Sequence, residues 1–201
     1  MTDDADQIIG LYDRHALAFD NDRSRTLFEK PQLDRFCGLV RRGGSILDIG
    51  CGMGEPIARY LIEAGHHLTG VDASPAMIGL CSTRFPHMTW AVADMRTLSL
   101  GRRFDGILAW DSFFHLRPAD QRPMFSVFQR HAAPNAVLMF TSGPRGGEAL
   151  ASYQGEPLYH ASLEPDEYRA LLGEYGFAVV SYDPENAACN GHTIWLARYC
   201  A

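Results

Sequence analysis

Apolar residues along the chain follow two patterns in turn, and their alternation predicts strands separated by helices. Short apolar runs, typical of strands buried on both faces of a parallel sheet, occur at residues 45–49, 67–71, 88–93, 104–110 and 137–141. The intervening stretches have helical spacing or helix-start signals and predict helices at 56–64, 75–85, 119–133 and 165–175. This order of elements predicts a doubly wound α/β domain with a mostly parallel sheet.

The two ends of the chain and one internal stretch fall outside this alternation. Residues 3–42 are predicted to form a helical segment, and residues 177–182 and 192–199 two closing strands. Residues 142–162 begin with glycine, proline and arginine and are predicted to be the longest loop, which in a compact domain is often a lid. We therefore expect one domain over residues 1–201, organised as a helical cap at 1–42, a cofactor-binding core at 43–141, a lid loop at 142–162, and a final helix and hairpin at 163–201.

A glycine-rich turn after the first predicted strand carries the clearest chemical signal. Residues 48–54 read D-x-G-x-G-x-G, and Asp72 ends the next strand, twenty-four residues after Asp48. Glycines allow backbone N–H groups to approach a ligand closely. A carboxylate at such a strand end can accept hydrogen bonds from both hydroxyls of a ribose. This unit is therefore predicted to bind a cofactor that contains a nucleoside.

Two familiar nucleotide-binding motifs do not fit this turn. The G-x-G-x-x-G fingerprint of dinucleotide sites requires a third glycine at position 55, where the chain has Glu55. A carboxylate at that point would repel a pyrophosphate. The chain also lacks a G-x-x-x-x-G-K-[ST] phosphate loop. A nicotinamide-dependent oxidoreductase is therefore disfavoured, and a cofactor without phosphate is favoured.

The turn at 48–54 closely resembles the first motif of the class I S-adenosylmethionine-dependent methyltransferases, of the type that acts on small molecules. Residues 104–116, FDGILAWDSFFHL, resemble the fourth motif of that family, and residues 11–20 resemble its amino-terminal cap. The resemblance implies a seven-stranded, doubly wound, Rossmann-like sheet with a C-terminal antiparallel hairpin. It also implies S-adenosylmethionine (SAM) as the cofactor and S-adenosylhomocysteine (SAH) as its product.

The same resemblance assigns residues to the cofactor site. Asp72 is expected to bind the ribose, Asp94 and the Met95 backbone the adenine, and an arginine of the cap, Arg23 or Arg25, the carboxylate of the cofactor. Tyr12 and other cap residues, namely Phe19 and Arg25, are expected to fold over it. The full set of expected cofactor-binding residues is Tyr12, Arg23, Asp48, Gly50, Cys51, Gly52, Gly54, Asp72, Ala73, Ser74, Met77, Asp94, Met95, Arg96, Trp110, Asp111 and Ser112.

The reaction implied by the resemblance is in-line transfer of the methyl group to a small-molecule acceptor. Alignment and desolvation of the acceptor can supply much of the acceleration. His115 is a candidate general base for an acceptor that has to lose a proton, because histidine titrates near neutral pH. Trp110, Phe113 and Phe114 are candidate walls that attract the sulfonium through their ring faces. The acceptor atom can be oxygen, nitrogen or carbon, and a non-catalytic module that binds SAM or SAH would carry the same motifs.

Composition limits the partners and the compartment. A net charge of −6 at pH 7 argues against wrapping a nucleic acid, and no apolar run approaches the length of a membrane span. The first ten residues are acidic and do not resemble a secretory signal. The five cysteines contain no CxxC pair, which favours reduced thiols and no metal site. We therefore expect a cytoplasmic protein with a small-molecule substrate, without a nucleic-acid or membrane partner; the sequence does not predict its oligomeric state.

Overall fold

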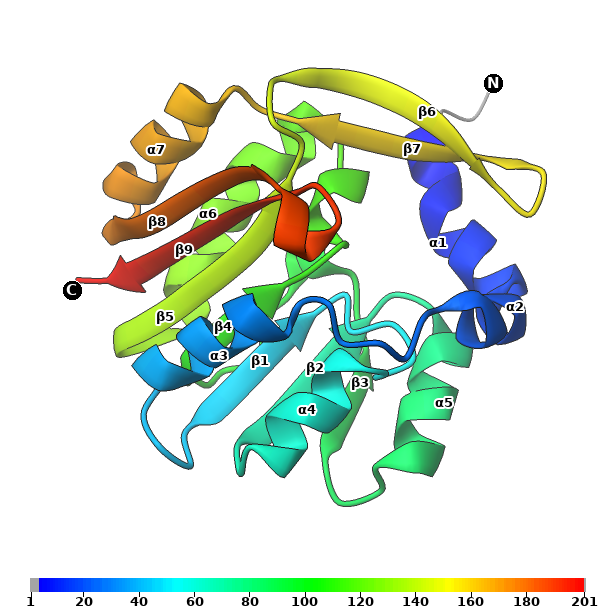
Figure 1. Ribbon diagram of the computed structural model, residues 1–201, viewed down its shortest axis with the longest axis horizontal. Helices are drawn as coiled ribbons and strands as arrows, with labels where there is room; N and C mark the ends of the chain where they lie inside the picture. Colours follow the sequence, from blue (N-terminus) through cyan, green and yellow to red (C-terminus); the bar gives the residue numbers. More distant parts are fainter. Residues whose placement is uncertain (1–3, 201) are drawn as a thin grey trace.

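The computed structural model describes residues 4–200, which form a seven-stranded sheet with helices on both sides and a separate two-stranded sheet (Figure 1). The order of strands is β3-β2-β1-β4-β5-β9-β8. Pairing is parallel from β3 through β5, whereas β9 is antiparallel to both β5 and β8. The predicted doubly wound sheet and its C-terminal antiparallel hairpin are confirmed. The strands are β1 (Ser45–Ile49), β2 (His67–Asp72), β3 (Thr89–Val92), β4 (Phe104–Ala109), β5 (Ala132–Ser142), β8 (Phe177–Asn186) and β9 (His192–Tyr199).

Helices cover both faces of the sheet, and the side chains of β5 alternate between two cores as this arrangement requires. Leu138 and Phe140 pack into the core beneath α6 and α7, whereas Val137 and Met139 pack into the core beneath α3 and α4. Because both faces of the strand are buried, its sequence is continuously apolar. The helices are α3 (Lys30–Leu39), α4 (Ile57–Glu63), α5 (Pro75–Arg84), α6 (Pro118–His131) and α7 (Pro165–Glu174), with single turns η1 (Met95–Thr97), η2 (Phe113–His115) and η3 (Ala187–Cys189).

An aromatic cluster fixes the segment that leaves β4. The Phe113 ring of η2 lies 5.3 Å from that of Phe140 and 5.7 Å from that of Phe128, measured between centroids. Phe140 in turn stacks on Trp195 at 5.8 Å. Phe113 is completely buried in this cluster, so it is a core residue and not the wall of a cofactor site that was expected. Its anchoring holds the neighbouring His115 at the edge of the sheet.

The amino-terminal segment consists of three helices instead of one continuous helical stretch. These are α1 (Asp4–Arg14), α2 (Ala16–Asp22) and α3, with an irregular connection between α2 and α3. Residues 1–3 of the predicted cap lie outside the described residues. Figure 1 shows α1 and α2 at the end of the sheet where the parallel strands finish, while α3 lies against a face of the sheet. The first two helices are therefore placed to cover a site at the strand ends.

Residues 147–162 form a hairpin, so the prediction of an irregular loop is wrong. Strand β6 (Gly147–Tyr153) pairs with β7 (Glu156–Ser162) across a two-residue turn, Gln154-Gly155. Both turn residues have positive φ, 52° and 80°, as tight hairpin turns require. β6 is exposed along nearly its whole length and β7 packs on α1. An exposed strand needs no apolar alternation, so residues 147–153 carry no periodic pattern that would predict a strand.

Candidate active site

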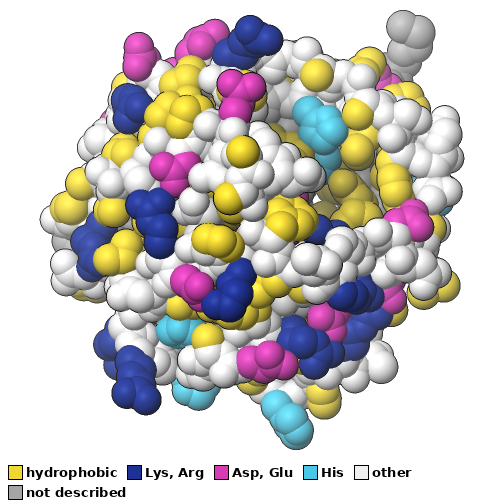
Figure 2. All heavy atoms as spheres, in the orientation of Figure 1, with side chains coloured by type: hydrophobic (Ala, Val, Ile, Leu, Met, Phe, Trp, Pro, Cys, Tyr) yellow, Lys and Arg dark blue, Asp and Glu magenta, His cyan; other side chains and the backbone are white. Residues whose placement is uncertain are grey.

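A cleft of about 940 Å³ lies at the carboxyl ends of the parallel strands, between the sheet and α1. Figure 2 shows a hollow on this side of the molecule, with hydrophobic side chains inside it and a histidine at its edge. Ligands in open α/β sheets bind at this edge. The cleft brings together most of the predicted site residues, which are Tyr12, Gly50, Gly52, Asp72, Ala73, Met77, Asp94, Met95, Arg96, Asp111, Ser112 and His115.

The glycine turn is pressed against the segment that follows β4. Gly50 has a φ of 75°, and a Cβ at this position would lie 2.2 Å from the Cβ of Ser112. The Ser112 hydroxyl donates a hydrogen bond to the carbonyl of Ile49 at 2.6 Å. Glycine is required here both by the backbone conformation and by the close approach of Ser112. The first and fourth motifs are thereby locked together beneath the cleft.

Asp72 is both a structural acceptor and a wall of the cleft. One carboxylate oxygen accepts the Gly52 N–H at 2.9 Å and the other accepts the Ser74 N–H at 2.9 Å. Burial raises the pKa of Asp72, while these backbone donors act in the opposite direction. Ser74 caps α5 by accepting the Met77 N–H at 3.2 Å, as its position before Pro75 predicted. The carboxylate also lines the cleft, where its remaining acceptor capacity is available to a ligand hydroxyl.

Asp48 and Cys51 lie beneath the cleft and do not line it. Asp48 is 4% exposed, and burial, with a further contribution from Asp72, raises its pKa to about 7. Burial and the neighbouring Cys81 raise the pKa of the Cys51 thiol well above its ordinary value. A Cβ on Gly70 would lie 2.9 Å from the Cys51 sulfur, so position 51 has little room for a larger side chain. This supports a packing role for Cys51.

Asp94 is in the cleft, but its carboxylate is already engaged. The Arg96 guanidinium contacts both carboxylate oxygens at 2.6–3.0 Å, and the Arg96 N–H donates to one of them at 2.9 Å. The paired guanidinium, ahead of the backbone N–H, lowers the pKa of Asp94. A ligand amine would therefore meet a carboxylate that is fixed in place and ionised at neutral pH.

His115 differs from the general base expected from the sequence. Its Nδ1 lies 2.8 Å from the Tyr159 carbonyl and its Nε2 lies 3.0 Å from the Tyr12 hydroxyl. Burial lowers the pKa of His115 to about 4, so the ring is neutral at pH 7. Since a carbonyl only accepts, Nδ1 carries the proton and Nε2 accepts from Tyr12. The expected titration near neutral pH is not met, and His115 instead orients the Tyr12 hydroxyl in the cleft.

A second histidine, which the sequence did not single out, holds Asp111. His192 Nε2 lies 2.9 Å and 3.1 Å from the two oxygens of Asp111, a residue in the uncommon left-handed region with φ 48°. The Asp111 N–H donates to the Thr141 hydroxyl at 2.8 Å. The Trp110 ring stacks on His192 at 5.6 Å, so Trp110 lies behind the cleft rather than in it. No local sequence pattern connects position 192 to position 111, because the sheet alone brings them together.

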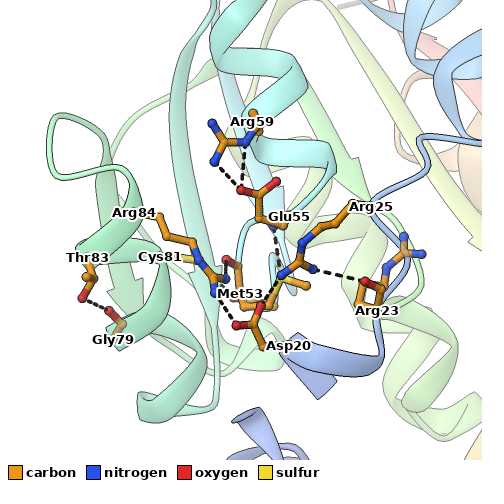
Figure 3. Close-up of polar contacts among 11 residues, drawn as sticks. Asp20, Arg23, Arg25, Met53, Glu55, Arg59, Gly79, Cys81, Thr83 and Arg84 are labelled. Carbon is orange, nitrogen blue, oxygen red and sulfur yellow. Dashed lines mark hydrogen bonds and ion pairs between the residues drawn. The ribbon is translucent and has the colours of Figure 1, made fainter. Parts of the chain in front are cut away.

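Arg23 is not brought to the cleft. It pairs with the buried carboxylate of Glu29, and its guanidinium lies over the Phe28 ring. Figure 3 shows the neighbouring Arg25 pointing to Asp20, which also pairs with Arg84 of α5. These arginines tie the connection after α2 to the body of the domain. Gly54 and Ser74 also lie outside the lining of the cleft.

Several lining residues that the sequence did not single out come from the middle of α1 and from the residues just before α6. Ile8 and Ile9 of α1 reach the cleft, as do Leu116 and Arg117 before α6. Arg117 pairs with Asp6 at 2.8 Å and so joins the two helices at the rim. The available signal was the pair of adjacent isoleucines in an otherwise polar helix, but spacing alone does not distinguish a cleft wall from a core contact.

Comparison with known proteins identifies the family. Residues 46–135 match the family described as a methyltransferase domain. The chain contains a methyltransferase domain over residues 46–135. The predicted recognition is therefore confirmed. Curated relatives of this methyltransferase domain include an O-methyltransferase from Aspergillus nomiae, 28% identical over 155 residues, with 70% of this chain and 67% of the relative covered.

Two further relatives are more similar over shorter stretches. One is the 2-heptyl-1-hydroxyquinolin-4(1H)-one methyltransferase of Mycobacteroides abscessus, 35% identical over 115 residues (51% of this chain, 50% of the relative). The other is the dTDP-3-amino-3,6-dideoxy-alpha-D-glucopyranose N,N-dimethyltransferase of Streptomyces fradiae, 32% identical over 107 residues (50% and 42%). The methyltransferase chain thus spans between 42% and 67% of the length of these three proteins.

Solved structures share the fold over nearly the whole methyltransferase chain. The DhpI–SAH complex has a TM-score of 0.77 at 17% identity, covering 98% of this chain and 97% of that one. SAM-bound CalS10, an amino pentose methyltransferase from Micromonospora echinaspora, has a TM-score of 0.71 at 19% identity, covering 92% and 95%. At these identities the similarity establishes the fold.

Residues 4–200, the described part of the chain, contain neither a helix that could span a membrane nor a cluster that could bind a metal ion. None of the helices in that range is long and apolar enough to span a bilayer. Nor does that range bring together three His, Cys, Asp or Glu side chains in an arrangement that could hold a metal ion.

Proposed function

We propose that the protein transfers the methyl group of SAM to a small-molecule acceptor. The observation that carries this proposal is the joint placement of the Gly50–Gly54 turn and Asp72 in one cleft at the strand ends. The methyltransferase family match and the SAM or SAH in solved structures of the same fold support it. The names of the curated relatives, which include O- and N-methyltransferases of small molecules, support the acceptor class.

The residues present fit this cofactor. Asp72 can accept two ribose hydroxyls, and Ile8, Ile9 and Met95 offer an apolar surface for a purine. Gly50 and Gly52, with positive φ, leave room for the amino-acid part beside Tyr12 and Asp111. When bound, SAM supplies a methyl group on a sulfonium, which leaves as a neutral thioether. Tyr12 and His115 would fix the position of this end, because their hydrogen bond orients the phenol.

The charge of the cleft favours a cationic cofactor over a pyrophosphate. The lining of the cleft carries more carboxylates than guanidinium groups, namely those of Asp6, Asp72, Asp94, Asp111 and Asp120 against those of Arg96 and Arg117. The ammonium and sulfonium of SAM are attracted to these carboxylates, whereas a dinucleotide would be repelled. Glu55, which follows the glycine turn, pairs with Arg59 of α4 at 2.5 Å. The same charges disfavour a nucleic-acid backbone as the partner.

Ligand binding tests the cofactor assignment. SAM and SAH should each raise the melting temperature, and NAD should not. A ligand at a hundredfold excess over its dissociation constant stabilises by about 2.7 kcal/mol. For a domain of this size that corresponds to a shift of roughly 5–10 °C. A shift with NAD and none with SAM or SAH would overturn the assignment.

Methyl transfer tests the enzyme against a non-catalytic SAM-binding module. Radiolabelled SAM is incubated with a panel of hydroxyquinolones, nucleotide-linked amino sugars, phenols and carboxylic acids. We expect label to enter at least one class of acceptor. Binding of SAM without transfer to any member of the panel would favour the non-catalytic alternative. The Asp72→Ala variant serves as the inactive control.

We further propose that the helices α1 and α2 and the β6–β7 hairpin act together as a lid. The Tyr153 ring at the tip of the hairpin lies 6.1 Å from Phe19 and 6.2 Å from His15, and Glu156 pairs with His15 at 2.7 Å. Hydrogen exchange of both segments should slow when SAM and an acceptor are bound. Equal exchange with and without ligands would argue against a lid.

The cysteines support the predicted compartment. All five side chains, Cys37, Cys51, Cys81, Cys189 and Cys200, are free thiols. We propose a cytoplasmic location, because reduced thiols persist there.

A further inference from the structure

A second cavity of about 890 Å³ shares none of its lining residues with the cofactor cleft. It lies between the base of the β6–β7 hairpin and the turn that precedes β9. Its lining includes His160 of β7, Phe114 of η2, Arg145, Asn190 and His192. Phe114 lines this cavity and the adjacent His115 lines the cofactor cleft, so the two cavities adjoin at this pair of residues. The boundary lies beside Tyr12 and His115, where the proposed function places the methyl-bearing end of the cofactor.

Three imidazoles lie at this junction, and two of them cannot accept a proton from a substrate. His192 Nδ1 lies 2.6 Å from the Cys189 carbonyl and Nε2 lies 2.9 Å from the Asp111 carboxylate. Both partners only accept, so both nitrogens carry protons and the ring is a cation. Stacking on Trp110 and the nearby Phe28 ring are compatible with that charge. The nitrogens of His115 are occupied by Tyr159 and Tyr12, as described above.

His160 is the third imidazole and differs from the other two. Within residues 4–200 neither of its ring nitrogens has a hydrogen-bond partner. Its ring is half-buried, stacked on His115 at 4.9 Å and 5.1 Å from the Phe114 ring. Burial lowers the pKa of His160, with Asp111 acting in the opposite direction, so the ring is neutral at pH 7. A neutral imidazole with free nitrogens, beside a cavity, can take up a proton.

We propose that the methyl acceptor binds in the second cavity and that His160 is the general base that deprotonates it. This inference rests on the proposed function. The acceptor is an O–H or N–H compound whose heteroatom must lose its proton. In the step, the heteroatom forms a bond to the methyl carbon while the carbon–sulfur bond breaks. The sulfur keeps the electron pair, and the acceptor proton moves to a nitrogen of His160.

The surroundings of His160 fit this role. The charged or titratable groups around it are Asp111 after β4, His115 of η2, Tyr12 of α1, His192 of β9, Arg145 before β6 and Glu148 in β6. Of these, Asp111 is neutralised by the fixed His192 cation. Arg145 has no ion-pair partner within residues 4–200 and lies on the cavity wall, where it can attract an acceptor with an anionic group.

The position of His160 can be tested without knowing the acceptor. SAM and SAH differ by one methyl group and one positive charge. The difference in the pKa of His160 between the two complexes therefore reports how close its ring lies to the sulfonium. The pKa of His160 is measured by NMR on protein with ¹³C-labelled histidine, with the signal assigned from a His160→Gln variant. We expect SAM to lower this pKa by about 0.5 unit or more relative to SAH. The exposed His67, at the opposite end of the sheet, should not change.

Calorimetry on the same samples separates the two proposals. If neither SAM nor SAH binds, the proposed function fails. If both bind and His160 titrates equally in the two complexes, the proposed function stands and the role of His160 is overturned.

The catalytic role has its own measurement in methyl transfer. With an acceptor from the transfer panel, His160→Gln should lower kcat at least tenfold, since general bases contribute roughly 10²–10⁴-fold. It should also remove the acidic limb of the pH–rate profile and leave SAM affinity unchanged. His67→Gln is the matched control and should retain the parent rate. A His160→Gln enzyme with the parent kcat and pH profile would overturn the inference.

Discussion

At the scale of single residues, the cofactor cleft is built from groups that support the backbone and face the ligand at once. Asp72 holds the glycine turn through Gly52 and the start of α5 through Ser74. The sequence identifies Asp72 because the distance along the chain between turn, helix and strand end is fixed by one βαβ unit. The Asp111–His192 pair has no such local spacing, and only the completed sheet defines it.

The first prediction concerns Asp72. Replacement by Ala removes two charge-assisted hydrogen bonds to the ribose and should cost on the order of 3 kcal/mol of binding, roughly a hundredfold in SAM affinity. Asp72→Asn should lose nearly as much, because its NH₂ group would face either the Gly52 N–H or the Ser74 N–H. Titration calorimetry measures both variants. Asp105→Asn, at the opposite end of the sheet, is the control, and parent-like affinity in Asp72→Ala would refute the ribose assignment.

The second prediction concerns Gly50. Gly50→Ala should destabilise the domain and weaken SAM binding at least tenfold, because the new methyl group would lie 2.2 Å from the Ser112 Cβ. Gly65→Ala is a matched control, since Gly65 also has a positive φ, 86°, but open space around it. The backbone strain alone costs about 1–2 kcal/mol at either site. Denaturant unfolding measures the stability of the two variants, and titration calorimetry measures their SAM affinity. Equal losses in Gly50→Ala and Gly65→Ala would mean that the contact with Ser112 is unimportant.

At the scale of elements, the predictability of each segment follows from how much of it is buried. Four strands are apolar because both of their faces are covered, and their positions can therefore be predicted from the sequence. These are β1, β2, β4 and β5. Strand β6 buries almost nothing, and its residues carry no period. Its hairpin was detectable only from the two-residue Gln154-Gly155 turn, which is a weak signal without β-branched residues beside it.

The third prediction concerns the buried network that holds the hairpin on the domain. Gln121 of α6 donates to the carbonyls of Leu116 and Ala161, both at 2.8 Å, and accepts the Tyr168 hydroxyl at 2.6 Å. Gln121→Leu removes the donor to the carbonyls of Leu116 and Ala161 and the acceptor of the Tyr168 hydroxyl, which keeps only its hydrogen bond from the Leu163 N–H. Each buried hydrogen bond lost in this way costs about 1–3 kcal/mol. We therefore expect a loss of about 3 kcal/mol or more and a melting temperature lower by roughly 6–12 °C.

The half-buried Gln129 of the same helix provides the comparison for this change. It makes one hydrogen bond, 3.2 Å long, to the Tyr175 carbonyl, so Gln129→Leu should cost about 1 kcal/mol or less. Scanning calorimetry of both variants measures the difference between their losses of stability. Similar losses at the two positions would mean that the network does not stabilise the attachment of β7.

At the scale of the whole molecule, the fold assembles its two cavities from segments far apart in the chain. The cap, the glycine turn, the end of β4 and the hairpin meet only because parallel strands end at one edge of the sheet. This edge also concentrates buried ionisable groups. Asp48 and His115 are both nearly inaccessible, yet burial moves their pKa values in opposite directions, to about 7 and about 4.

The last prediction is that these two groups give stability opposite dependences on pH. Between about pH 4 and 7 the folded protein binds a proton at Asp48 that the unfolded chain has released, so raising the pH destabilises the fold. Between about pH 4 and 6.5 the unfolded chain binds a proton at His115 that the folded protein excludes, so lowering the pH destabilises it. Each unit of pKa difference corresponds to about 1.4 kcal/mol, and both effects are on the order of a few kcal/mol.

Two isosteric variants separate these contributions in the ligand-free protein. Relative to the parent, Asp48→Asn should become progressively more stable as the pH rises from 4.5 to 7, because it no longer has to bury a charge. Relative to the parent, His115→Gln should become progressively more stable as the pH falls from 6.5 to 4.5, for the corresponding reason. Urea unfolding of the parent and of both variants at several pH values measures the difference in the free energy of unfolding between each variant and the parent. Differences that are flat with pH, or that share one sign, would show that these side chains ionise in the folded protein as freely as in the unfolded chain.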